Sequence, residues 1–221
     1  MKLSAVLLAR AIGFVETFDL SPKTSIFYPE LVKEIVAHYN FQKFPKEFKD
    51  FDEQKGVEFL QGKYGDMVID KAVIYSNGLL IDTRENTKIS EQLIEEALVW
   101  GKSKFGLAYH SGLIRRVGYL SQLTFYSDVP LNALNPALKK LSDRITSAVT
   151  EIHKEPLDYQ TTGVVIAHDP LKRKNPLAAF TILPRVETPL SEHKYFSEAP
   201  LPTDLHWELL EEFEAALVSQ K

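Results

Sequence analysis

The sequence predicts an α+β protein. Two units, each ordered strand, helix, strands, helix, are expected to form one curved antiparallel sheet with the helices on one face. Apolar periodicity alternates between strand and helix spacing in the same order in both halves of the chain. An Asn-Gly pair between two apolar runs marks an antiparallel hairpin, and several residue pairs recur at fixed intervals. Together these observations indicate an internally duplicated chain.

The first half opens with a long strand and a helix. From Ser4 to Phe18 apolar side chains occupy both faces, with Arg10 and Glu16 as exceptions, which is typical of a strand covered on both sides. Pro29 favours the first turn of a helix, where a missing N–H costs no hydrogen bond, and the helical spacing ends near Tyr39.

Three strands and a second helix complete the first half. The strands are expected at Val57–Lys63, Met67–Tyr75 and Leu79–Thr83. The pair Asn77-Gly78 joins the last two strands, because both residues tolerate positive φ. Thr87 is placed to cap the next helix, and Gly106 is placed to end it.

The second half repeats this order. A long two-sided strand is expected at Leu113–Ser127, Pro136 opens a helix, and Thr203 or Asp204 caps the last helix. The apolar positions of the middle helix are Leu138, Leu141, Ile145 and Val149. Further strands are expected at Leu157–Thr161, Gly163–His168 and Leu177–Val186.

Two intervals support duplication. Thr124-Phe125 precedes Pro136 as Thr17-Phe18 precedes Pro29, and these pairs are 107 residues apart. Residues 93–97 match residues 209–213 at an interval of 116. One compact unit of two pseudo-repeats is therefore expected, with residues 1–106 as the first repeat, residues 113–221 as the second, and an insertion near residues 170–202.

Composition excludes several classes of protein. The 221 residues carry a formal net charge of −4, which lacks the basic excess of a general nucleic-acid binder. The chain has no cysteine, so disulfides, thiolate catalysis and cysteine metal sites are excluded. The most apolar stretch, Leu3 to Val15, is interrupted by Arg10 and is too short to span a bilayer. A cytoplasmic location without membrane association is the expectation.

Catalytic and cofactor motifs do not emerge from the sequence. It has no glycine-rich phosphate loop that leads a strand into a helix, and no Gly-x-Ser-x-Gly turn. The six histidines lack the close spacing of paired metal ligands, so neither a cofactor nor a metal is expected. His168 beside Asp169 is the candidate general base if the protein is an enzyme, although Asp169-Pro170 equally forms an ordinary turn.

Two basic groups are candidate binding residues. Arg115 and Arg116 begin the second long strand, where a guanidinium on the sheet needs an anionic partner, either Asp70 or Glu58 or a ligand. The densest basic cluster is Lys172, Arg173 and Lys174, at a hairpin tip that either meets an anionic partner or is simply solvated.

Aromatic residues supply two further candidate regions. Phe41, Phe44, Phe48 and Phe51 alternate with lysines, a pattern that fits a core-packed amphipathic turn better than a protein interface or single-stranded nucleic acid. Residues 188–203 are proline-rich and lack periodicity, but they include Tyr195 and Phe196. This segment is expected to be an arm that binds a partner or lies over the body of the protein.

One segment carries a resemblance to a known family. The run from Ile114 to Tyr119, with Leu123 and a turn at residues 128–130, follows a helix that carries Trp100. It resembles the conserved middle segment of a sporadically distributed, uncharacterised bacterial family, which usually has Arg one residue before Tyr. The resemblance implies no catalytic residue, and its patchy distribution implies mobile or defence-associated genes. The order of elements is also similar to TATA-binding-protein-like and helix-grip folds, a likeness that carries no function.

The expected function is that of a non-catalytic cytoplasmic interaction, accessory or scaffold component, with a link to bacterial antiviral defence implied only by the resemblance. A protein partner or self-association is expected, a membrane is not, and nucleic acid is disfavoured. The alternative is an enzyme that binds a small molecule or nucleotide in a pocket between sheet and helices, with Arg115 or Arg116 as the anion site. Nucleic-acid binding is the third interpretation.

Overall fold

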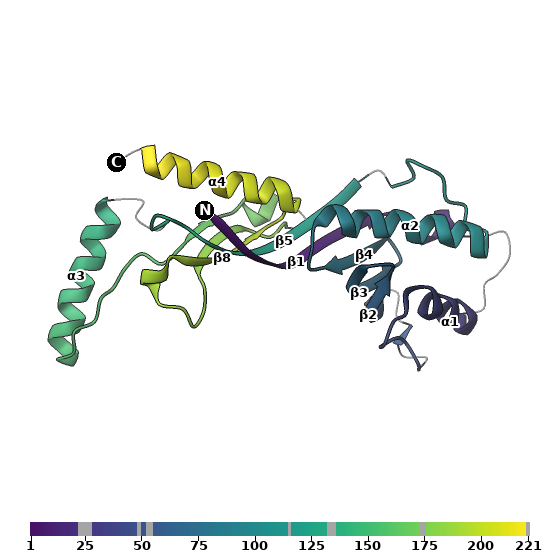
Figure 1. Cartoon of the computed structure of the whole chain (residues 1–221), viewed down its shortest axis with the longest axis horizontal. Helices are drawn as coiled ribbons and strands as arrows, with labels where there is room; N and C mark the ends of the chain where they lie inside the picture. The colour runs from purple at the N-terminus through teal and green to yellow at the C-terminus, as the bar shows by residue number, and fades with distance from the viewer. Residues whose placement is uncertain are drawn as a thin grey trace. The chain divides into compact units, whose positions relative to one another are not determined.

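The computed structural model describes residues 1–21, 28–47, 50–51, 55–114, 116–131, 136–172 and 176–219. These residues form an α+β structure with one antiparallel sheet of strand order β2-β3-β4-β1-β5-β8-β7-β6 (Figure 1), so the predicted fold class is confirmed. The strands are β1 Lys2–Phe14, β2 Val57–Tyr64, β3 Met67–Tyr75, β4 Gly78–Thr83, β5 Arg116–Tyr126, β6 Val164–Ile166, β7 Phe180–Pro184 and β8 Lys194–Ala199. The helices are α1 Tyr28–Tyr39, α2 Thr87–Phe105, α3 Pro136–His153 and α4 Thr203–Ser219.

The strand order is the same in both halves when it is read outward from the centre. The first half gives β1, β4, β3, β2, and the second half gives β5, β8, β7, β6. Each half also has one helix after its first strand and one after its last strand. This shared topology is compatible with duplication. The interval of 107 residues makes Phe18 and Phe125 equivalent, but Phe18 follows the end of β1 and is 85% exposed, whereas Phe125 is fully buried in β5.

The chain divides into two compact units. The N-terminal unit contains Val6–Ser121 and Pro200–Asp204. The C-terminal unit contains Met1–Ala5, Gln122–Ala199 and Leu205–Lys221. Each unit therefore includes a part of both long strands, β1 and β5.

In the N-terminal unit the hairpin expected at Asn77-Gly78 is present but shifted by one residue. Tyr75 pairs with Gly78, so Ser76 and Asn77 form the loop. Gly78 is required there for space rather than for positive φ, because a Cβ atom would lie 2.7 Å from the Gly13 carbonyl oxygen.

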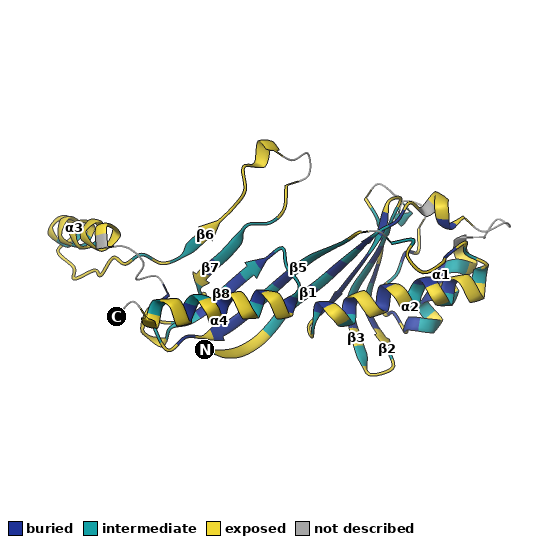
Figure 2. Cartoon of the chain, turned by 90° about the horizontal axis from the view of Figure 1, so that it is seen from above, coloured by how far each residue is buried: buried dark blue, intermediate teal, exposed yellow. Residues whose placement is uncertain are grey.

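Helices α1 and α2 pack on one face of the strands of the N-terminal unit. Their buried faces include Val32 and Ile35 of α1 and Leu93 and Leu98 of α2 (Figure 2). Gly106 ends α2 in the left-handed conformation, with φ of 69°, as predicted. The N-cap is Asn86, whose side chain accepts a hydrogen bond from the Lys88 amide. The predicted cap, Thr87, is instead the first residue of the helix.

The other face of these strands carries charged pairs. Lys71, Asp82 and Arg10 are directly opposite one another on β3, β4 and β1. Arg10 binds Asp82 through two hydrogen bonds of 2.7 and 2.8 Å, and Lys71 forms an ion pair with Glu58. The two acidic and two basic groups balance, so this row offers no net charge to nucleic acid.

In the C-terminal unit α4 packs on the sheet through buried aromatic and polar groups. Phe125 of β5 stacks on Tyr195 and meets Trp207 of α4 edge to face, with ring centroids 5.8 and 5.9 Å apart. Burial lowers the pKa of His206 to about 4. Because the Ser197 hydroxyl donates to the Thr181 carbonyl oxygen, His206 Nε2 carries the proton and donates to Ser197 Oγ.

Helix α3 differs from the other helices. None of its described side chains, at residues 137–153, is buried, and Leu138, Leu141, Ile145 and Ile152 are between 37% and 73% exposed (Figure 2). Its amphipathic pattern correctly predicts a helix, but the described residues supply no core for its apolar face.

Two sequence expectations for residues 157–203 are wrong. Residues 157–161 do not form a strand, because their backbone instead bonds to α3: Tyr159 N donates to Thr146 Oγ1 at 2.8 Å. Residues 188–203 are not an irregular arm, because Lys194–Ala199 is strand β8, which lies between β5 and β7. Its buried residues alternate as Tyr195, Ser197 and Ala199, and only the first of these is large.

The N-termini of α2 and α4 satisfy each other within the N-terminal unit. Thr87 N donates to Thr203 Oγ1 at 3.1 Å, and Thr203 N donates to Thr87 Oγ1 at 2.9 Å. Both residues are buried, so their amides have no access to water as an alternative. The two threonines are 116 residues apart, the interval at which residues 93–97 match residues 209–213.

We expect Thr87→Val and Thr203→Val each to lower the free energy of unfolding by about 0.5 to 2 kcal/mol, because each leaves one buried amide of the opposite helix without an acceptor. Urea denaturation measures the change. The matched control, Thr162→Val at an exposed position, should stay within about 0.5 kcal/mol of the parent protein. Equal stability of all four proteins would contradict the reciprocal bonding.

Candidate functional site

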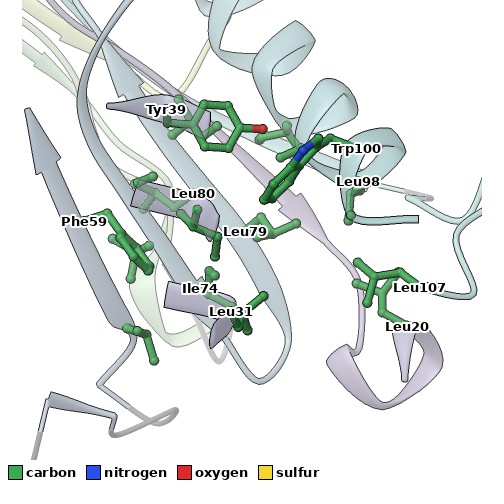
Figure 3. A pocket seen from close by; sticks show the side chains of 18 of the residues that line it. Leu20, Leu31, Tyr39, Phe59, Ile74, Leu79, Leu80, Leu98, Trp100 and Leu107 are labelled. Carbon is green, nitrogen blue, oxygen red and sulfur yellow. The ribbon is translucent and has the colours of Figure 1, made fainter. Parts of the chain in front are cut away.

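A cavity of about 630 Å³ lies in the N-terminal unit between α1, α2 and the strands β2, β3 and β4 (Figure 3). Trp100 and Leu98 reach it from α2, and Leu79 and Ile74 line it from the strands. Leu20 and Leu107 close one end, where the Ala108 amide donates to the Leu20 carbonyl oxygen at 3.3 Å.

The cavity wall is almost entirely apolar. No described residue in the lining carries a formal charge, and the hydroxyl groups among them belong to Ser21, Tyr39 and Tyr75. Aromatic rings contribute much of the rest, including Phe41, which the sequence placed in the core and which is 4% exposed. The site is therefore suited to apolar surface and offers little to an ionic ligand.

Three tyrosine–glutamate pairs hold α2 to surrounding elements along its length. The donor and acceptor pairs are Tyr119 to Glu91 at 2.9 Å, Tyr109 to Glu95, and Tyr39 to Glu96. Each glutamate belongs to α2, whereas the tyrosines lie on β5, on the segment after α2, and on α1. These hydrogen bonds fix the distance of α2 from its neighbours independently of apolar packing.

A further polar contact fixes the first turns of α2 on the sheet. Ser90 Oγ donates to the Ala9 carbonyl oxygen of β1 at 2.7 Å and lies 3.0 Å from Thr83 Oγ1 of β4. Ser90, Thr83 and Ala9 are fully buried. Together with the Thr87–Thr203 bonds, this contact anchors the start of α2 on the strands.

Glu96 is the centre of a polar and aromatic cluster at one end of the cavity. Tyr39 donates to one carboxylate oxygen, and His38 Nε2 lies 2.9 Å from the other. The His38 ring stacks on Trp100, with centroids 4.3 Å apart and planes at 13°. Tyr64 is close enough to interact electrostatically with the Glu96 carboxylate.

The protonation of this cluster follows from its surroundings. Burial raises the pKa of Tyr39 far above its ordinary value, and the hydrogen bond to Glu96 raises it further. The charge of Glu96 raises the pKa of Tyr64 in the same direction. Both phenols therefore stay neutral near pH 7 and act as hydrogen-bond donors or acceptors, not as bases.

Arg116, one of the predicted binding residues, lies outside this cavity lining. Its side chain is exposed, and the guanidinium lies 4.0 Å from the centroid of the Phe14 ring. The expected carboxylate partners are engaged elsewhere, since Asp70 pairs with Arg84 and Glu58 pairs with Lys71. Neither Asp70 nor Glu58 is therefore the partner of Arg116, a ligand at Arg116 stays a prediction, and Arg115 lies outside the described residues.

His168, the candidate general base, is an exposed residue of the C-terminal unit that closes a turn. Its Nδ1 lies 2.9 Å from the Asp169 carbonyl oxygen, and its Nε2 accepts a hydrogen bond from the Leu177 amide at 3.1 Å. The Asp169 carboxylate accepts from the Leu171 amide. These contacts fit the turn interpretation and form no histidine–carboxylate dyad.

The remaining candidates are also in the C-terminal unit. Lys172 is exposed at the end of a short 3-10 turn, whereas Arg173 and Lys174 lie outside the described residues. Tyr195 is buried in β8, and its hydroxyl accepts a hydrogen bond from the Leu131 amide at 3.1 Å. Phe196 follows it on the strand, half-buried and opposite Leu183 of β7.

The sequence reasoning missed the cavity and the Glu96 cluster. A signal was present for the cluster, because Glu91, Glu95 and Glu96 share a helix with apolar positions and the chain holds nine tyrosines. The cavity has no comparable signal, because an apolar residue that lines a void has the same pattern as one in a filled core.

Comparison with known proteins gives no match to a family model and none to a curated protein. The likeness of the segment around Ile114 to Tyr119 to an uncharacterised bacterial family therefore stays a resemblance. Within the described part of the chain, no helix has the length and apolar character needed to cross a bilayer.

The tyrosine–glutamate pairs predict a loss of stability in alkali. Burial, followed by hydrogen bonding to glutamate, raises the pKa of Tyr109 and of Tyr119 to about 12, whereas an unfolded tyrosine titrates near pH 10. Between these values the unfolded chain loses phenolic protons that the folded protein keeps, so the free energy of unfolding falls as pH rises.

Urea denaturation at a series of pH values from 9 to about 11.5 measures this fall. The double variant Tyr109→Phe, Tyr119→Phe should show a shallower fall over the same range. Tyr159→Phe, a control at a residue 44% exposed, should keep the slope of the parent protein. The interpretation is wrong if the double variant and the parent protein have the same slope.

Proposed function

We propose that the N-terminal unit binds a small, uncharged and mainly apolar molecule in the cavity between α1, α2 and the strands. The observation that carries this proposal is the cavity itself: its volume of about 630 Å³ is typical of ligand pockets, and its wall is apolar. A packed protein interior normally leaves few voids larger than a water molecule.

The chemistry of the lining supports an uncharged ligand. Desolvating a charge in this wall would cost several kcal/mol without a compensating ion pair, because no described lining residue is charged. The Tyr39 hydroxyl is committed to Glu96, which leaves Ser21 and Tyr75 as the other described lining residues with a hydroxyl, so ligand recognition would rest mainly on shape and apolar contact. Trp100 and Phe41 supply flat aromatic surface of the kind that apolar and aromatic ligands contact well.

Binding, rather than catalysis, agrees with the position of the titratable groups. The enzyme interpretation assigned an anion site to Arg115 or Arg116 and a base to His168, and neither described residue lines the cavity. The polar cluster around Glu96 resembles the other two tyrosine–glutamate pairs of α2, which favours a structural role for it.

Protein interaction is the second candidate function, and exposed apolar side chains of the C-terminal unit favour it. Leu141 and Ile152 of α3 are 55% and 73% exposed, and Val165 and Ile166 of β6 are 64% and 63% exposed. Clusters of this kind are typical of surfaces that a partner covers. A cytoplasmic location and a role in bacterial defence are retained as proposals, and neighbouring genes would test the latter.

The binding proposal predicts that Ala97→Phe blocks the cavity. Ala97 lines it from α2, and a phenyl ring at this position would occupy part of the space. The affinity for N-phenyl-1-naphthylamine, an uncharged apolar probe, should fall at least about tenfold, measured by the increase in probe fluorescence on titration with protein.

Val99→Phe is the matched control, since Val99 lies on the same helix and is 52% exposed. It should leave the probe affinity unchanged, and both variants should keep the parent's far-ultraviolet circular dichroism. Probe binding that Ala97→Phe does not weaken, or no probe binding by the parent protein, would refute the proposal.

A further inference from the structure

We infer that α3 is the docking site for a second copy of this chain, which contributes its own α3 to an antiparallel helix pair. This inference goes beyond ligand binding and concerns a different part of the molecule. It rests on the apolar stripe of α3, on the side of the helix that the described chain leaves open, and on the charges that flank the stripe.

The apolar side chains of α3 repeat at coiled-coil spacing. Leu138, Leu141, Ile145, Ala148 and Ile152 occupy alternating intervals of three and four residues over most of Pro136–His153. All five are exposed. Val149 lies beside this seam and is half-buried, and apolar residues at alternating intervals of three and four are the pattern that a partner helix covers.

The chain segment that follows α3 in the sequence, around Leu157 and Tyr159, contacts a different side of this helix. Leu157 N donates to Thr150 Oγ1 at 3.4 Å, and Tyr159 N donates to Thr146 Oγ1 at 2.8 Å. At 100° per residue, these threonines lie more than a quarter turn away from Leu141 and Ile145. The chain's own contacts therefore leave the seam open to another molecule.

The charges beside the seam are self-complementary in only one orientation. Arg144 and Glu151 occupy equivalent positions, seven residues apart, on the same edge of the stripe. In an antiparallel pair, equivalent edges face each other, so Arg144 of each copy meets Glu151 of the other. In a parallel pair, Arg144 would instead face Val149, and no opposite charges would meet.

The same antiparallel register fills the seam. It places Ile145 beside the small side chain of Ala148 of the second copy in the two central layers, and Leu141 beside Ile152 of the second copy in the two outer layers. Both contacts occur twice because a two-fold axis relates the copies. A second copy thus satisfies the size pattern and the charge pattern together, which is the argument for it over an unrelated partner.

Analytical ultracentrifugation of the full chain over a concentration series tests the pairing. The parent protein should be a reversible dimer, and Leu141→Glu should be monomeric because it places a charge in the seam. Arg144→Glu and Glu151→Arg should each weaken the dimer at least about tenfold by creating like-charge pairs. Mixing these two single variants should restore dimers, because the carboxylate introduced in one copy then meets the guanidinium introduced in the other.

Lys140→Glu is the matched control: it makes the same charge change on α3 but away from the seam, and should leave the dimer constant unchanged. Circular dichroism melting should show that Leu141→Glu folds as the parent does. A parent protein that is monomeric throughout overturns the inference. So does a dimer that Leu141→Glu abolishes while the charge reversals and their mixture have no effect, because that result excludes the antiparallel register.

Discussion

The position of helix α2 is set by hydrogen bonds, and the other features of the N-terminal unit depend on this constraint. Its amino end is bonded to Thr203, its first turns to the Ala9 carbonyl oxygen, and its later turns to three tyrosines. The bonds to Thr203 and to the Ala9 carbonyl oxygen are buried, and buried hydrogen bonds are costly to break without replacement. Leu93 and Leu98 of α2 are buried in the same unit, and a cavity of about 630 Å³ lies between this helix, α1 and the strands.

The two halves of the chain share one topology but differ in how their helices are packed. Helices α2 and α4 begin at threonines that are bonded to each other, 116 residues apart. Beyond that point the halves diverge. Helix α1 buries Val32 and Ile35 against its neighbours, whereas α3 buries none of its described side chains. If the halves descend from one duplicated unit, the proposed ligand compartment uses the first helix of one half and the proposed assembly uses the first helix of the other.

Local signals in the sequence predict the fold well, and contacts between distant residues explain the failures. Pro29 and Gly106 were read correctly because a helix end depends on its own backbone. Strand β8 was missed because flanking prolines and the small buried residues Ser197 and Ala199 hide its alternation. Arg116 is expected to have an anionic partner, either a carboxylate or a ligand, but an aromatic face also accepts a guanidinium, as Phe14 does here.

The central claim is that polar contacts hold open an apolar cavity ready for a ligand. A crystal structure of the unliganded protein under xenon pressure tests it most directly, because xenon binds in apolar cavities of proteins. The account predicts xenon between Trp100 and the strands, with α2 and its tyrosine partners in place. A site without xenon, in which Trp100 and Leu98 have filled the space, would contradict it.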